Sequence, residues 1–222
     1  MAAIVRLTRT KRKIIKAQTT VVDLIPRLIP VLKKRIKAYH NMFSLPLIAE
    51  HWEELLHRSF GDIGYSTTWI PSRSHKIGED MSLPSIPNSR ISCKSGAISN
   101  CRALRESCVN FNGSRSESHP TLAEKIKHFS TSHDDYYFLL SKKKASKKKP
   151  FDFTYNLLVF PSSLCRIDQL DWEETVTRKQ WKSSFRPNGP KFCAPISKSM
   201  SAQLWTTLPL RLITHQHDIV CK

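Results

Sequence analysis

The stretch GEDMSLPSIPNSRISCKSG, residues 78–96, brings an acid, a hydroxyl and a lysine into one short segment. Asp80 precedes a proline-punctuated loop, and Ser92 and Lys94 follow that loop in an alternating apolar–polar run. Hydrolysis of a phosphodiester near neutral pH needs a metal ion, anionic oxygen ligands that hold the ion, and a positive group that supports the attacking water. An aspartate at the start of one strand and a lysine on the neighbouring strand supply the second and third of these.

The alternation over residues 91–94 is typical of a half-buried strand, in which successive side chains point to opposite faces of the sheet. Ser92 and Lys94 are therefore expected on one face. Cys93 points away, and its backbone carbonyl remains as a potential neutral ligand. By the same rule Glu79 and Asp80 point in opposite directions, so both cannot easily serve one ion, and we assign the role to Asp80.

The segment LPLIAEHWEELLHRSFGDIG, residues 45–64, predicts the clearest helix of the chain. A glycine at position 61 is expected to end it. Its apolar residues recur at helical spacing and its glutamates lie away from the centre of that stripe. The expected stripe consists of Ile48, Trp52, Leu55, Leu56 and Phe60.

Four pieces of the sequence, in order, resemble the PD-(D/E)XK nuclease superfamily, and more narrowly type II restriction endonucleases. They are the glutamate-bearing helix HWEELLHRSF, the GED that supplies Asp80, the ISCK strand and the SG that ends this strand. The resemblance covers roughly residues 47–98. It implies Mg²⁺ held by acidic side chains and one backbone carbonyl, with the lysine next to the attacking water. The metal ligands would be Asp80, the Cys93 carbonyl and Glu53, and the catalytic set would be Asp80, Ser92, Lys94 and Glu53, with Glu50 as the substitute for Glu53.

Ser92 departs from the pattern of that family, because a second carboxylate usually stands at this position. A hydroxyl is a weak Mg²⁺ ligand, so a water or Glu53 would have to supply the missing charge. The alternative interpretation of the same residues is structural: Asp80 caps a turn and Lys94 is a solvated strand residue.

The charge of the chain points to a polyanionic partner. Thirty-six basic residues against 18 acidic ones give a net charge of +18, and nucleic acid is the usual partner of such a chain. We expect phosphate contacts from a basic N-terminal arm, residues 1–20, and from a basic loop, residues 141–150. A polar loop at residues 111–120 places an arginine before a helix, where it suits phosphate or base-edge contact. The predicted DNA-binding residues are Arg115, Ser114, Lys142, Lys143, Lys144, Lys147, Lys33 and Lys34.

The order of elements predicts a single domain over residues 1–222, a mixed α/β (α+β) fold around a central mixed sheet flanked by helices. The resemblance narrows this to a restriction-endonuclease-like fold. Prolines at positions 26 and 30 restrict the first helix to about Pro30–Tyr39. The other expected elements are strands at 65–70, 90–96, 136–140 and 151–160, a helix capped by Thr121, an edge strand within 203–213, and a tail that contains His215 and His217.

Several features narrow the compartment and the cofactors. No apolar run is long enough to cross a membrane, and no phosphate-binding glycine loop indicates a nucleotide cofactor. The six cysteines contain no C-x-x-C pair, which favours a reduced cytoplasmic chain, in a prokaryote if the resemblance holds.

These observations lead to a homodimeric, Mg²⁺-dependent endonuclease that cuts double-stranded DNA at a short palindrome. One alternative is a basic nucleic-acid-binding protein without catalysis. Another is a repair or junction-resolving nuclease of the same superfamily.

Overall fold

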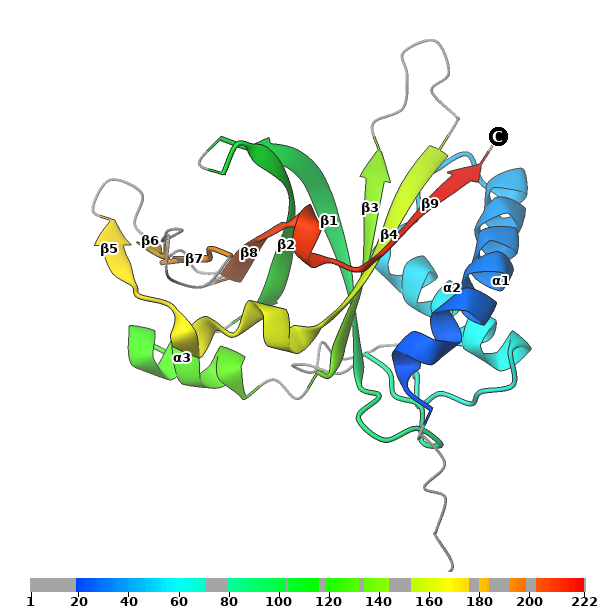
Figure 1. Cartoon of the computed structure of the whole chain (residues 1–222), viewed down its shortest axis with the longest axis horizontal. Helices are drawn as coiled ribbons and strands as arrows, with labels where there is room; N and C mark the ends of the chain where they lie inside the picture. Colours follow the sequence, from blue (N-terminus) through cyan, green and yellow to red (C-terminus); the bar gives the residue numbers. More distant parts are fainter. Residues whose placement is uncertain are drawn as a thin grey trace, which may run out of the picture.

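The computed structural model describes residues 19–70, 80–102, 104–115, 119–131, 134–143, 153–175, 180–183, 192–198 and 203–221. These residues form a nine-stranded mixed sheet with helices packed against it (Figure 1). The strand order is β5-β6-β7-β8-β2-β1-β3-β4-β9. Among the described strands only β1 and β3 pair in parallel. The mixed α/β class with a central mixed sheet is confirmed.

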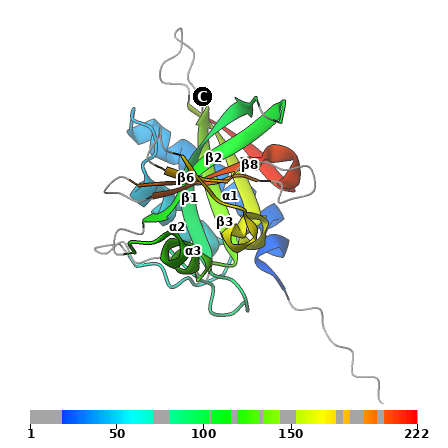
Figure 2. The ribbon, with the colours of Figure 1, turned by 90° about the vertical axis from the view of Figure 1, so that its left-hand side faces the viewer.

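The elements have the following bounds. The α-helices are α1 (Val21–Met42), α2 (Ala49–Asp62) and α3 (Leu122–Ser130), and the 3-10 helices are η1 (Ser162–Cys165), η2 (Ile167–Gln169) and η3 (Leu210–Leu212). The strands are β1 (Ile91–Cys101), β2 (Glu106–Arg115), β3 (Tyr136–Lys143), β4 (Phe153–Pro161), β5 (Glu173–Thr175), β6 (Gln180–Lys182), β7 (Pro195–Ser197), β8 (Gln203–Pro209) and β9 (His215–Cys221). Figure 2 shows how the strands cross at an angle, as expected of a twisted sheet.

Helix α1 is longer than its prolines led us to expect. It begins at Val21, where Thr20 and Asp23 form a capping box, and it continues through Pro26 and Pro30. Both prolines are exposed and lie one turn apart, so the carbonyls that lose a helical partner face solvent. The prediction of a helix restricted to Pro30–Tyr39 was wrong, because burial of the opposite face of α1 outweighs the cost of the prolines.

Helix α2 forms where the sequence predicts a helix, but its end and its buried stripe differ from the prediction. Gly61 lies inside the helix, and the left-handed residue after its end is Gly64, with φ of 89°. The Tyr65 N–H donates to the Phe60 carbonyl across this turn, at 2.9 Å, the bond that closes a Schellman motif. Ile48 is the N-cap and is 53% exposed, so it is not part of the buried stripe.

The sheet separates two hydrophobic cores. The helix-side core lies under α1 and α2 and includes Trp52 and Phe138. The α3-side core lies on the other side and includes Phe129 and Phe160. Strand β1 contributes to both, since Ile91 belongs to the first and Ile98, further along the strand, packs against the second.

Strands β1 and β3 pair over the first half of β1 and most of β3. Their shared register runs from the pair Ile91 and Tyr136 to the pair Gly96 and Ser141. Beyond this point β1 continues beside β2, and β3 continues beside β4. Figure 1 shows the two hairpins diverging from there. The strand that carries the predicted chemistry therefore begins in the middle of the sheet.

Other predictions are corrected or confirmed by the described elements. Residues 65–70 do not form a strand, and residues 111–115 are the end of β2 and not a loop. Strand β8 is internal, between β7 and β2, and the predicted tail forms edge strand β9. The β3–β4 hairpin and the Thr121 cap of α3 are confirmed. No helix among the described residues is long and apolar enough to span a membrane.

Candidate active site

Asp80 is held beside the start of β1 by backbone pairing. Its N–H donates to the Ile91 carbonyl at 3.0 Å, and the next residue, Met81, forms an antiparallel bridge with Ile91. The Asp80 carboxylate then accepts two hydrogen bonds through Oδ2, from the Cys93 backbone N–H at 2.6 Å and from Ser92 Oγ at 3.2 Å. A short bond from a backbone N–H to a carboxylate is a strong, charge-assisted one. The position of this carboxylate is therefore fixed mainly by the backbone of β1.

Lys94 completes the predicted group of three side chains. Its Nζ lies 3.9 Å from Asp80 Oδ2, and the two side chains are 20% and 23% exposed. At this separation and degree of burial, the two charges attract each other more strongly than they would in water. The expectation that the side chains of residues 80, 92 and 94 meet is confirmed as geometry.

Ser92 and Cys93 differ in which of their groups could contact a metal ion at the site. Ser92 is fully buried, so this part of the strand is more deeply covered than the half-buried pattern predicted. The Cys93 side chain lies in the helix-side core, and burial, followed by the negative charges of Asp80 and Glu53, holds the pKa of its thiol well above the usual value. In an extended strand the N–H and C=O of one residue point to the same edge, so the Cys93 carbonyl lies on the edge that faces Asp80.

Glu53, on α2, is a further acidic side chain near Asp80 and Lys94. The preceding residue, Trp52, is buried and donates its indole N–H to the carbonyl of Phe138, the β3 partner of Cys93, at 3.4 Å. This contact fixes α2 above the start of β1. Burial raises the pKa of Glu53, and the nearby negative charge of Asp80 raises it further, while Lys94 opposes the shift. The three charged side chains of the expected catalytic set, Asp80, Lys94 and Glu53, therefore influence one another electrostatically.

Glu50 plays a different part in this arrangement. Its side chain is exposed at the start of α2, one turn before Glu53. Its charge makes a smaller contribution to the raised pKa of Glu53 than Asp80 does. Of the two glutamates offered by the sequence, Glu53 is the one that is electrostatically coupled to both Asp80 and Lys94.

Trp69 is a further neighbour of Glu53 that sequence reasoning missed. Its Nε1 is buried and has no hydrogen-bond partner among the described residues, yet the indole N–H is close enough to lower the pKa of Glu53. The ring stacks on His57 of α2 with centroids 5.0 Å apart. Trp69 lies in the segment expected to be an ordinary strand, and no spacing signal in the sequence linked it to Glu53.

The donor set can be compared with the needs of Mg²⁺. The described residues contain no cluster of three or more His, Cys, Asp or Glu side chains suited to a metal ion. Mg²⁺, however, is usually bound by one or two carboxylates and keeps several waters. Two acids whose charges influence each other, a backbone carbonyl and a hydroxyl therefore fit Mg²⁺, and they do not fit a zinc-type site built from nitrogen and sulfur ligands.

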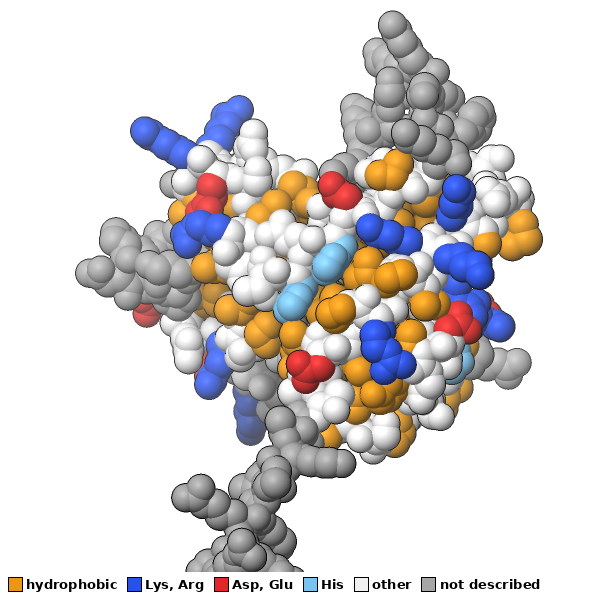
Figure 3. Space-filling model, turned by 45° about the vertical axis from the view of Figure 1, so that its right-hand side comes forward, with side chains coloured by type: hydrophobic (Ala, Val, Ile, Leu, Met, Phe, Trp, Pro, Cys, Tyr) orange, Lys and Arg blue, Asp and Glu red, His pale blue; other side chains and the backbone are white. Residues whose placement is uncertain are grey.

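The predicted DNA-binding residues are scattered over the surface. Lys33 and Lys34 are exposed on α1, and Figure 3 shows lysine and arginine side chains spread over the face that carries this helix. Lys142 is exposed at the end of β3, with its Nζ 5.1 Å from the centroid of the Phe153 ring.

The remaining predicted contacts are only partly described. Ser114 and Arg115 are the last two residues of β2, and Lys143 is the last residue of β3. The structure describes only the backbones of these three residues. Lys144 and Lys147 lie outside the described residues, as does most of the predicted arm at residues 1–20.

Comparisons with protein-family models, with curated proteins and with solved structures found no match to this chain. The assignment of a function therefore depends on the geometry of the site and on the charge of the chain.

Proposed function

We propose that the protein is a Mg²⁺-dependent endonuclease of the PD-(D/E)XK type that hydrolyses phosphodiester bonds in double-stranded DNA. The observation that carries this proposal is the joint placement of Asp80, Lys94 and Glu53 around the start of β1. The net charge of +18 supports a polyanionic substrate. The same features favour a restriction-endonuclease-like fold for the domain.

Each residue has a role in this proposal. The Asp80 carboxylate, anchored through Oδ2 by the Cys93 N–H, and the Glu53 carboxylate would hold the ion, with the Cys93 carbonyl as a neutral ligand. Bound Mg²⁺ supplies the polarisation of the phosphoryl oxygen and the acidification of water that hydrolysis needs. Lys94 would orient the attacking water and stabilise the negative charge that develops on the phosphate.

A homodimer that cuts a short palindrome is the form of this activity that we favour. A two-fold symmetric protein places one site against each strand of a two-fold symmetric duplex, so one binding event leads to two cuts. This is the arrangement of a type II restriction endonuclease.

The test is a digest of supercoiled plasmid and linear phage DNA by the full chain, with Mg²⁺ and with EDTA. Discrete bands that require Mg²⁺ are expected. Lys94→Ala should lower the rate by about 10²–10⁴-fold, the usual contribution of a group that assists proton transfer, and Asp80→Asn should abolish the Mg²⁺ response. Lys127→Ala, at an exposed position on α3, and Asp168→Asn, at an exposed carboxylate paired with Arg166, are the matched controls and should cut normally.

The other outcomes separate the rival functions. Binding without cutting would favour a basic nucleic-acid-binding protein, whose log affinity should fall with log salt at a slope of about −7 if about eight phosphate contacts form. Nicking or a preference for branched DNA would favour a repair or junction-resolving nuclease. Unchanged cutting by Lys94→Ala would show that the site is assigned wrongly.

A further inference from the structure

Three of the six cysteines come together near the end of the β1–β2 hairpin. Cys101 is the last residue of β1, Cys108 lies on β2, and Cys193 forms an isolated bridge with Thr207 of β8. We call Cys101, Cys108 and Cys193 the thiol cluster. All six cysteines are free thiols, and the other three pack in or against the hydrophobic cores: Cys93, Cys221 and Cys165.

The strand register places the thiol cluster on one face of the sheet. Ser99 pairs with Cys108. Because side chains alternate along a strand, Cys101, two residues after Ser99, lies on the same face as Cys108 and is its diagonal neighbour. Thr207 lies on this face too, through its pairing with β2, and it brings its bridge partner Cys193 with it.

The Cys108 thiol leans along its strand toward Cys101. Its Sγ lies 3.9 Å from the carbonyl oxygen of Glu106, which is the register partner of Cys101. Burial, followed by the charge of Cys101 and a hydrogen bond between the two sulfurs, raises the pKa of Cys108 to about 12. The proton of this pair is therefore held on the buried Cys108 thiol, next to the Cys101 sulfur.

A cavity of about 470 Å³ gives access to the thiol cluster. Cys101 and Cys193 both line it, and both are half-buried. Cys108 does not line the cavity and is fully buried. A small oxidant in the cavity would therefore meet Cys101 or Cys193 before Cys108. Of these two, Cys101 is the one whose sulfur is hydrogen-bonded to Cys108.

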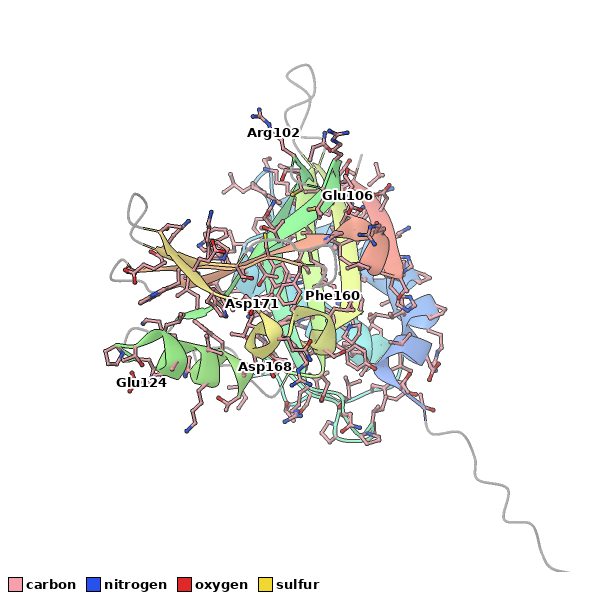
Figure 4. The ribbon with its side chains drawn as sticks, turned by 60° about the vertical axis from the view of Figure 1, so that its left-hand side comes forward. Arg102, Glu106, Glu124, Phe160, Asp168 and Asp171 are labelled. Carbon is pink, nitrogen blue, oxygen red and sulfur yellow. The ribbon has the colours of Figure 1, made fainter. Side chains whose placement is uncertain are left out.

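The charges around Cys101 favour reaction of its thiol. Lys182, on β6, is the charged residue among the described residues that line the cavity. Figure 4 labels Arg102 and Glu106, which lie on either side of the hairpin turn beside Cys101. The Glu106 carboxylate is paired with Arg211 at 2.8 Å, so its charge is offset. A positive, partly exposed surrounding is the environment in which cysteines react as thiolates.

We propose that Cys101 and Cys108 are a peroxide-reactive thiol pair that closes to a reversible disulfide across the end of the β1–β2 hairpin. Cys101 is the thiol that meets the oxidant, and Cys108 is the thiol that completes the bridge. This inference does not depend on the proposed nuclease activity, because it concerns the chemistry of the two sulfurs with hydrogen peroxide.

The reaction takes place in two steps. The Cys101 thiolate attacks one oxygen of hydrogen peroxide, the O–O bond breaks, and the leaving hydroxide takes up the proton that Cys101 lost, which gives water and a sulfenic acid. The Cys108 sulfur then attacks the Cys101 sulfur. The S–O bond breaks, and hydroxide leaves with the Cys108 proton as a second water. The two thiols supply the two electrons that reduce the peroxide.

Closing the bridge requires a small movement at the end of the hairpin. Diagonal neighbours in an antiparallel pair have Cα atoms about 7–8 Å apart, whereas a disulfide usually spans no more than about 6.8 Å. Cys101 is the last residue of β1 and is followed by a turn, so the strand end has to shift by only about 1 Å. A bridge closed against such a constraint is readily reduced, which makes the oxidation reversible.

The test counts thiols and maps the bridge in the full chain. The reduced protein is treated with a small molar excess of hydrogen peroxide, quenched and unfolded, and its thiols are titrated. We expect the count to fall from six to four and to return to six with dithiothreitol. Trypsin cuts after Arg102 and Arg105, so Cys101 and Cys108 fall on separate peptides that only the disulfide holds together in mass spectra.

Two variants assign the roles of the pair. Cys101→Ser should keep all five of its thiols after the same treatment, because the thiol that meets the oxidant is gone. Cys108→Ala should stop at the sulfenic acid, so that dimedone labels Cys101 in this variant. Dimedone should label Cys101 much less in the wild type, where the bridge consumes the sulfenic acid.

The matched controls are single thiols outside the pair. Cys193→Ser, in the same cluster, and Cys165→Ser, against the α3-side core, should each still lose two thiols and give the same linked peptides. Six thiols remaining in the treated wild type would overturn the inference, as would a bridge to Cys193 or a loss of two thiols in Cys101→Ser. None of these results bears on cleavage of DNA, so the proposed function is tested separately.

Discussion

The Cys93 backbone N–H donates to the Asp80 carboxylate at 2.6 Å, and this bond joins the two halves of the candidate site. It ties a carboxylate on one segment to the backbone of the strand that carries Lys94. A side-chain substitution at Ser92 would leave the bond in place. The hydroxyl of Ser92, at 3.2 Å from the same oxygen, is a second contact on the same atom.

Ser92→Asp should restore a second carboxylate at the position where the resembling family has one. Without metal, a carboxylate at the buried position 92 would lie about 3 Å from the Asp80 carboxylate and repel it, so the unfolding temperature should fall. Mg²⁺ should raise it by more than in the wild type, since a ligand at 100 times its Kd stabilises by about 2.7 kcal/mol. Thermal unfolding with and without Mg²⁺ measures this, with Ser92→Ala as the uncharged control. An equal Mg²⁺ response in all three proteins would count against a metal at this position.

Glu53→Gln should stabilise the folded protein at neutral pH. Burial and the charge of Asp80 raise the pKa of Glu53 in the folded state, so the ionised carboxylate costs stability above its unfolded pKa. As the pH falls through the raised pKa, the folded protein takes up a proton and this cost disappears. Urea unfolding at pH 7.5 and pH 5 should show an advantage of the variant that shrinks at the lower pH. Glu54→Gln, at a side chain that is 40% exposed and paired with Arg58 one turn away, should show no such gain.

Trp69→Phe should shift the pH dependence of cleavage. The indole N–H lowers the pKa of Glu53, so its removal raises that pKa and moves the acidic limb of the pH–rate profile to higher pH. The phenyl ring can keep the stack on His57, so the fold should survive. Trp172→Phe is the control, because that indole donates to the Ile167 carbonyl on the other side of the sheet. Coincident profiles for wild type and Trp69→Phe would separate Trp69 from the site.

Gly96→Ala should destabilise the strand two residues after Lys94. A Cβ at Gly96 would stand 2.8 Å from Leu139 Cδ2 and 2.9 Å from the Asn110 carbonyl oxygen. The backbone oxygen cannot move without breaking the sheet, so we expect a loss of about 1–3 kcal/mol. Gly61→Ala meets nothing within 4 Å inside α2, and should be stabilising by about 0.5–1 kcal/mol. Chemical unfolding of both variants checks the contrast, and equal stabilities would refute it.

Local signals in the sequence predicted the start of β1, the hairpin of β3 and β4, and the cap of α3. Each is encoded within a few neighbouring residues, by alternation or by a capping pair. The meeting of Asp80, Ser92 and Lys94 followed from the same alternation, because residues two apart on a strand share a face. The electrostatic influence of Asp80 and Lys94 on Glu53 depends on how Trp52 anchors α2 to the sheet, which residue spacing does not encode.

The errors arose where distant contacts override local preference. Strand β9 pairs with β4, more than 50 residues earlier, and its two histidines give no apolar pattern. Residues 65–70 have a strand-like composition, yet the contact formed there is between Thr68 and Ser82. The α1 prolines predict a short helix by local preference, but the burial that compensates their cost comes from α2 and the sheet.

Strand β1 is shared by both cores, and the residues proposed for catalysis lie where the two cores meet. A fragment that lacked either the helical half or the β5–β8 half would leave one face of this strand in water. Neither half on its own would therefore keep residues 92–94 in their strand geometry. Any cleavage activity would then require both halves, and limited proteolysis between them should abolish it.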